Sequence, residues 1–315
     1  DVDIQDADIL DATGLVVTPG LIDMHVHLRQ PGQSAKETIE SGTKAAAAGG
    51  FTRVATMPNT KPVIDSAIIV DGLKYKIADE GVVKVDIIGS LSKGLEGKEL
   101  SSMGGMSKAG VVAFSDDGRY VQNCDFMRKA MEYAGMFGKI VIDHCEDADL
   151  IEGGHMHEGV VSHELGLKGR PAVAEDIAVA RDILLAEATG TAVHIAHIST
   201  KNAVQMVRQA KAKGLKVTAE ATPQHMILTD EALRSYDPRF KVNPPLRSEE
   251  HRKAVVEGLV DGTIDAIVTD HAPHTIEEKD CEFSLAPSGF VGLETSLGTV
   301  LTYLYHAGIV DLMTL

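Results

Sequence analysis

Apolar, β-branched runs alternate along the chain with segments of helical periodicity. The runs cover residues 20–27, 51–57, 83–91, 110–115, 139–144, 192–198, 216–221 and 265–270. Short apolar runs of this kind, most of them preceded by a glycine, are typical of the buried strands of a parallel sheet. The pattern therefore predicts eight strands.

The segments between these runs have the spacing of amphipathic helices. They cover residues 34–48, 65–78, 125–136, 172–188, 200–213 and 248–259, with a weaker pattern at 96–108 and a further helix beginning near Leu293. Ser34 and Glu37 have capping-box spacing at the start of the first helix, and Gly49 follows its end. Eight strand–helix units predict an α/β fold of the closed (β/α)8, or TIM-type, barrel. An open doubly wound sheet is the alternative.

Both ends of the chain look incomplete beside such a barrel. The first 17 residues have a β-type sequence, and the chain stops barely past the eighth helix. We therefore expect residues 1–17 to be the remnant of a small accessory β domain at the N-terminus. Residues 18–315 are expected to form the barrel.

Composition narrows the class of partner. The net charge of −16 disfavours nucleic acid, because phosphate binding requires a basic surface. No run of about 18 apolar residues predicts a membrane span, and no basic-then-apolar leader is visible. The three cysteines show no CxxC spacing, so we expect a reducing, cytoplasmic location without disulfides.

Histidine and aspartate mark five of the predicted strand ends. In a (β/α)8 barrel the functional residues lie at the carboxyl ends of the strands. Those found there are His25, His27, Asp117, His144, His197 and Asp270. A single buried histidine is usually a core residue, but four imidazoles and two carboxylates at one mouth fit the ligands of hydrolytic zinc.

Alternation selects the side chains that face the mouth. In the stretch LIDMHVHLRQPG, residues Asp23, His25, His27 and Arg29 share one face, and the residues between them are apolar. His25 and His27 can therefore grip one ion. Asp23 either orients a neighbouring imidazole or lies below the metals.

The same reasoning chooses between two aspartates after the fourth strand. Ala113, Ser115 and Asp117 fall on one face, and the bulky residues between them belong against the helices. We therefore expect Asp117 to face the mouth and Asp116 to be a loop or capping residue.

Other titratable residues are expected to be structural. His194 lies three residues before His197, an odd offset that predicts the opposite face. Glu175 and Arg181 are spaced for an ion pair on one helix, and His157 lies in a long loop expected to be exposed.

Nine motifs resemble the bacterial class I dihydroorotases of the amidohydrolase superfamily. From about Thr18 to the end they follow in unbroken order: GLIDMHVHLRQPG, TMPNT, AFSDDG, DHCED, HIAHIST, TAEATPQH, KVNPPLR, VTDHAPH and LAPSG. The HxH motif is common to the whole superfamily, whereas the aspartate of FSDDG is more discriminating. Hydantoinases and allantoinases carry a carboxylated lysine there, and no lysine ends this strand.

The resemblance implies a ligand set and a role for each substrate-binding residue. One metal is assigned to His25, His27 and Asp270, the second to His144 and His197, and Asp117 bridges them. Two Zn²⁺ ions per subunit are expected, and a single ion per subunit is the alternative. Substrate is held by Arg29, Asn59, Asn243 and His274, and main-chain groups at Pro287 and Gly289 close over the ring. Gln224 departs from the family, where two adjacent histidines are common.

The implied reaction is the reversible hydrolysis of L-dihydroorotate to N-carbamoyl-L-aspartate in pyrimidine biosynthesis. Asp270 would move the proton from the nucleophilic water to the leaving nitrogen. Arg29 would bind the substrate carboxylate in a planar fork and supply the positive site that the acidic composition lacks. The alternatives are a sister cyclic-amide hydrolase and a non-catalytic partner of aspartate transcarbamoylase. A homodimer and association with that enzyme stay open.

Overall fold

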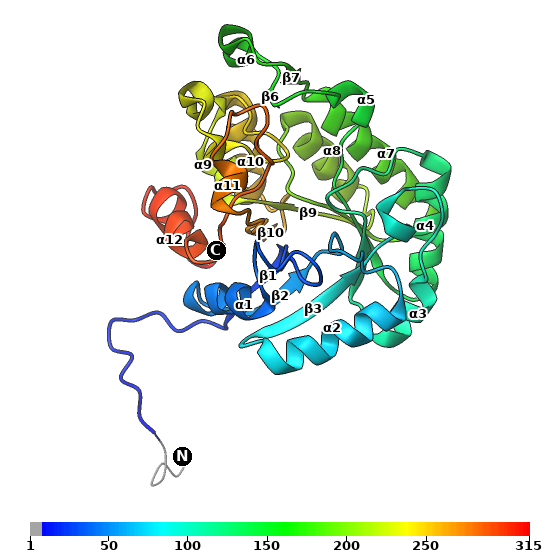
Figure 1. Ribbon diagram of the computed structural model, residues 1–315. Helices are drawn as coiled ribbons and strands as arrows, with labels where there is room; N and C mark the ends of the chain where they lie inside the picture. Colours follow the sequence, from blue (N-terminus) through cyan, green and yellow to red (C-terminus); the bar gives the residue numbers. More distant parts are fainter. Residues whose placement is uncertain (1–7) are drawn as a thin grey trace.

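Eight parallel strands form the centre of the computed structural model, which describes residues 8–315 (Figure 1). They are β1 (Leu21–Val26), β2 (Phe51–Thr56), β3 (Lys84–Gly89), β4 (Ala113–Ser115), β5 (Ile140–Asp143), β8 (Val193–Ile195), β9 (Val217–Ala221) and β10 (Ala266–Ile267). The strands are hydrogen-bonded in chain order, each parallel to the next. The predicted barrel and its eight strands are thus present.

The ring closes between its last and first strands with little backbone pairing. β10 has only two residues, and it is joined to β1 through a bridge between Val26 and His271. The amide of His27 donates to the carbonyl of His271 at 2.9 Å. The buried carboxylate of Asp23 accepts from the amide and the hydroxyl of Thr269 across the same seam. Side-chain contacts therefore complete the closure.

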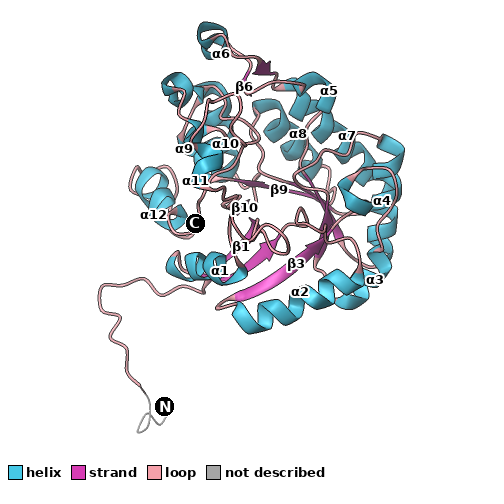
Figure 2. Cartoon of the chain, viewed as in Figure 1, coloured by secondary structure: helices cyan, strands magenta, loops and turns pink. Residues whose placement is uncertain are grey.

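Helices surround the strands on the outside (Figure 2). They are α1 (Ile39–Ala48), α2 (Ala67–Glu80), α3 (Met103–Ala109), α4 (Cys124–Met136), α7 (Val173–Thr189), α8 (Lys201–Ala212), α10 (Glu249–Val260) and α12 (Ser296–Val300), which runs into a π-helical turn over Leu301–Tyr305. The large apolar core lies between helices and strands. A smaller cluster that includes Ala113, Ile142 and Ala196 fills the inside of the barrel.

The first helix starts later than its capping-box spacing predicted. α1 begins after Thr38, whose side chain accepts from the amide of Ser41. Ser34 instead accepts from the side chain of Gln30, and the carboxylate of Glu37 accepts from His271. The residues that look like a helix start are therefore used to fix the loop after β1, which carries Arg29.

Shorter elements lie between the barrel units. They are η1 (Lys93–Leu95), α5 (Ala148–Ile151), β6 (Met156–His157), α6 (Val160–Leu165), β7 (Gly169–Arg170), α9 (Pro223–Ile227), η2 (Asp230–Ser235), η3 (Pro238–Phe240) and α11 (Ile276–Lys279). The weak pattern at 96–108 corresponds to a loop followed by α3. The excursion from α5 to β7, which follows β5, rises above the rim (Figure 1).

The segment before the barrel carries no strand where it is described. Residues 8–17 are mostly exposed and lead away from the barrel (Figure 1). The rest of the predicted accessory remnant, residues 1–7, lies outside the described residues. The division at residues 17 and 18 therefore stays a prediction. Among the described helices, none has both the length and the apolar character needed to cross a bilayer.

Candidate metal centre

Six side chains from five strand ends converge above the barrel. β1 provides His25, and His27 follows its last residue. The loops after β4, β5, β8 and β10 provide Asp117, His144, His197 and Asp270. All are buried except Asp270, whose side chain is 13% exposed.

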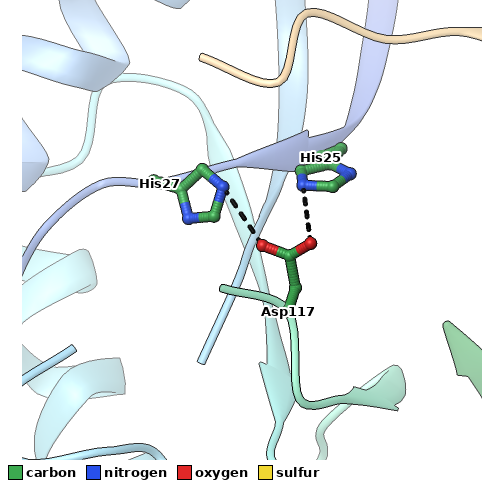
Figure 3. Close-up of side chains that lie close together, drawn as sticks. All are labelled: His25, His27 and Asp117. Carbon is green, nitrogen blue, oxygen red and sulfur yellow. Dashed lines mark ion pairs between the residues drawn. The ribbon is translucent and has the colours of Figure 1, made fainter. Parts of the chain in front are cut away.

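Asp117 lies at the centre of this cluster. Its Oδ1 is 3.6 Å from Nε2 of His25, and its Oδ2 is 3.4 Å from Nε2 of His27 (Figure 3). Nδ1 of His144 and Nε2 of His197 approach the same Oδ1 at 3.4 and 3.5 Å. One carboxylate therefore faces two pairs of imidazoles, as the alternation along residues 112–117 predicted.

Asp270 adds a second carboxylate on the β1 side. Its Oδ1 is 3.1 Å from Nε2 of His27 and 3.4 Å from Nε2 of His25. Asp270 and His197 both have positive φ, at 48° and 30°. Non-glycine residues in this region are strained, and such strain is concentrated at functional sites.

Unpartnered buried atoms show that the cluster suits a cation. Nε2 of His25, Oδ1 of Asp117 and Nδ1 of His197 are buried without a hydrogen-bond partner, whereas buried polar groups are normally paired. Three sets of ligand atoms each lie within 4.8 Å of one another, and Asp117 belongs to two of them. Imidazole and carboxylate donors in this arrangement fit one or two divalent ions of the zinc type.

The charges within the cluster stabilise one another. Burial disfavours the charged imidazole of His25, but Asp117 and Glu220 raise its pKa well above the usual value. Burial likewise opposes ionisation of Asp117, yet His25 and His144 hold its pKa well below the ordinary range. The pKa of His144 is raised to about 9. Protons on His25 and His144 thus balance the carboxylates, and a bound cation would displace them.

Glu220 supports the cluster from below and was not anticipated from the sequence. Its Oε1 accepts from Nδ1 of His25 at 2.6 Å, which leaves Nε2 of that ring facing Asp117. Its Oε2 is 3.0 Å from Nε2 of His194. The prediction that His194 faces away from the site is therefore wrong. Asp23 accepts from the backbone amide of His25, so it fixes the strand rather than the imidazole.

A cavity of about 240 Å³ opens over the cluster, and five of the six side chains line it; His25 lies beneath them, fully buried. Five of the six residues expected to bind substrate line it, namely Arg29, Asn59, Asn243, His274 and Gly289. Pro287 is not among the lining residues, and its carbonyl accepts from Nζ of Lys279 at 2.8 Å. The amide of Gly289 donates to the carbonyl of Lys241.

Arg29 is one of the residues that line the cavity. It follows β1 with φ at 61°, and its Nε donates to the carbonyl of Pro273 at 3.1 Å. Within the described chain no side chain or carbonyl accepts from its two terminal nitrogens. The two terminal nitrogens are therefore available to bind a carboxylate in a bidentate manner.

The neighbouring side chains set the tautomers of two histidines. Oδ1 of Asn59 is 2.8 Å from Nδ1 of His27, so Nδ1 donates and Nε2 is left to face the carboxylates. Nε2 of His274 donates to the carbonyl of Ser288 at 2.9 Å. Burial and the charge of Arg29 lower the pKa of His274 to about 4, so this ring is neutral.

A parallel (β/α)8 barrel with four imidazoles and two carboxylates at the carboxyl ends of its strands defines the amidohydrolase class. An L-hydantoinase (dihydropyrimidinase) from Arthrobacter aurescens has this fold, with a TM-score of 0.86 over 98% of this chain and 72% of its own at 24% identity.

The sequence comparisons define the family. A family model described as dihydro-orotase-like matches residues 14–203. A dihydroorotase from Pelotomaculum thermopropionicum is 59% identical over 96% of this chain and 71% of its own length. One from Geobacter metallireducens is 56% identical over 97% and 72%. The chain belongs to the dihydroorotase-like family.

Proposed function

We propose that this protein is a dihydroorotase, which opens the ring of L-dihydroorotate reversibly to N-carbamoyl-L-aspartate. The observation that carries the proposal is that two side chains line the same cavity: Asp117, which lies among the four histidines, and Arg29. An aspartate at this position and a guanidinium in the cavity lining suit a cyclic amide that bears a carboxylate. The relatives named dihydroorotase support the same substrate.

Two Zn²⁺ ions per subunit are the cofactor we propose, with a single ion as the alternative. The ligands would be His25, His27 and Asp270 for one ion, His144 and His197 for the other, and Asp117 for both. When bound, such ions lower the pKa of water towards about 7 and polarise a carbonyl.

The protein's own residues bind the substrate and move the proton. Arg29 holds the carboxylate through its terminal nitrogens and orients the ring above the cluster. Burial opposes ionisation of Asp270, but His25 and His27 lower its pKa, so the group is held as an ionised carboxylate with the capacity to accept a proton. We assign it the transfer of that proton from water to the leaving ring nitrogen, a role that typically contributes about 10²–10⁴-fold.

Turnover of dihydroorotate by the purified protein tests this proposal. We expect ring opening and ring closing that stop after chelation and return with Zn²⁺, and little hydrolysis of hydantoin or allantoin. Preference for hydantoin or allantoin would favour the sister hydrolases. No turnover with zinc present would favour a non-catalytic partner of aspartate transcarbamoylase, which the six filled ligand positions disfavour. Homodimer formation and association with aspartate transcarbamoylase stay predictions. Light scattering of the protein alone, and of the protein mixed with aspartate transcarbamoylase, would check them.

A further inference from the structure

A single guanidinium at the rim holds the side chain of Asn243. Arg170 is the last residue of β7, and its side chain is 17% exposed. Its NH1 donates to Oδ1 of Asn243 at 2.6 Å and lies 3.4 Å from Oε2 of Glu146. Its Nε donates to the carbonyl of Gly154 at 2.8 Å. The guanidinium is therefore fixed from two further sides.

This contact determines which end of the carboxamide faces the cavity. Arginine can only donate, so the atom it approaches must be the oxygen of Asn243. The amide nitrogen then points the other way and donates to the hydroxyl of Tyr120 at 2.7 Å. One N–H of the amide is left, and Asn243 lines the cavity. The remaining N–H is therefore the group through which this carboxamide can donate into the cavity.

Tyr120 connects this wall to the metal-type cluster. Its ring lies against the imidazole of His144, with 4.9 Å between the ring centroids. Glu146, which lies beside the Arg170 guanidinium, is also 3.6 Å from Nε2 of His144. A donor placed here is therefore next to the reacting centre.

We infer that Arg170 is a positioning residue, which fixes the carboxamide of Asn243 with its nitrogen towards the substrate. The inference rests on the proposed function, because it specifies how that substrate is held. A flipped amide would present its oxygen to the carboxylate or carbonyl oxygens of dihydroorotate, and two acceptors repel. The excursion between β5 and α7 then serves to bring Arg170 to the rim.

The backbone at Gly154 packs closely against the side chain of Arg170 and so restricts its position. A Cβ at Gly154 would lie 2.5 Å from Cγ of Arg170 and 2.7 Å from the carbonyl of Gly169. No larger residue fits there without moving the arginine or the backbone of β7. The length and fork of the guanidinium also matter, because lysine offers one compact charge that cannot make the same set of contacts.

A double-mutant cycle with Arg170→Lys and Asn243→Ala tests the inference. Lysine keeps a positive charge near Glu146, so the fold and the metal content should be retained. Each single variant should raise KM for dihydroorotate on the order of tenfold, with a smaller change in kcat. The double variant should be no worse in KM than Asn243→Ala, because Arg170 acts through that amide.

Controls separate this result from a general loss of structure. Arg239 is 81% exposed and pairs with Asp237, so Arg239→Lys should leave KM unchanged. Elemental analysis of each variant should give the metal content of the unaltered protein. KM changes that multiply to about 100-fold in the double variant, or lost metal in Arg170→Lys, would overturn the inference. If the unaltered protein does not turn over dihydroorotate, the proposed function fails first and the inference falls with it.

Discussion

Two buried clusters of titratable groups lie near strand β5, and they differ in where their positive charge comes from. In the site cluster, Asp117 meets imidazoles at 3.4–3.6 Å, and several atoms have no hydrogen-bond partner. Behind the strand, Arg181 donates to Asp143 and to Asp182, both at 2.7 Å. One cluster contains its own cation, and the other has room for one.

The second cluster shows that a set of acidic groups and a thiol does not suffice for a metal site. Asp143, Cys145 and Asp182 also place ligand atoms within 4.8 Å of one another. However, the guanidinium of Arg181 already occupies their acceptors, and the Cys145 thiol donates to Asp182 at 3.3 Å. Burial and Asp182 raise the pKa of Asp143 well above its usual value. Geometry therefore separates the two clusters where composition does not.

The largest effect should come from neutralising the carboxylate of the site cluster. Asp117→Asn removes the group that faces both histidine pairs, so metal content should fall and ring opening should drop on the order of 10³-fold or more. Elemental analysis and steady-state rates would measure both. The matched variant is Asp182→Asn, which should retain its metal. If Asp117→Asn kept both metal and rate, the distinction between the clusters would fail.

Removing the internal cation should instead cost stability. Arg181→Met leaves the buried acidic pair of Asp143 and Asp182 without its cation, so the free energy of unfolding should fall by about 3–5 kcal/mol. Chemical denaturation would measure the loss. Metal content per folded protein should change little. A variant as stable as the unaltered protein would show that the arginine is dispensable there.

A smaller effect is expected from the carboxylate beneath the site cluster. Glu220→Gln keeps the size of the side chain but weakens the bond that orients His25, so metal affinity should fall by about 10–100-fold. Competition with a calibrated chelator would give the affinity. Unchanged affinity would mean that the imidazole is held by its other contacts alone.

The smallest expected effect is a change in how stability depends on pH. It involves a second buried ion pair, Arg247 with Glu175. His157 lies against Arg247, and burial together with that charge lowers its pKa to about 3. The unfolded chain takes up a proton near pH 6.5 that the folded chain refuses, so stability falls as pH drops from 6.5 towards 3.

His157→Gln should remove this dependence. The difference in unfolding free energy between the two proteins should change by about 1 kcal/mol from pH 7 to pH 5, with allowance for solvent screening. Denaturation of chelated protein at several pH values would show it. A constant difference would mean that the ring is protonated in the folded state.

The strand pattern predicted the cluster because the face to which a side chain at a strand end points follows from the local alternation along that strand. His25 and His27 needed only the two-residue period of β1, and Asp117 needed the period of β4. His194 was placed wrongly because His197 lies beyond the end of β8 with positive φ, so counting back from it does not give the face. Alternation along β9 would have pointed to Glu220, since Val217, Ala219 and Ala221 are the apolar positions.

Contacts between distant segments could not be predicted in this way. Arg181 was expected to pair with Glu175 one helical turn and a half away, but Glu175 pairs with Arg247. His157 was expected to be exposed and is buried against that arginine. A long side chain can reach several partners, and packing across the rim decides which one it contacts. The pattern of residues along the sequence does not contain this information.

The seam between β10 and β1 has a consequence for heat inactivation. Asp270 follows β10 and lies 3.1 Å from His27 across this seam, so parting of the ring there would separate residues proposed to share one metal ion while the strongly paired strands on the far side stay intact. Warming should therefore abolish turnover at a lower temperature than it melts the helices, and amide protons of Thr269 and His271 should exchange with solvent ahead of those in β4 and β5. The enzyme would lose its chemistry while most of its fold was still intact.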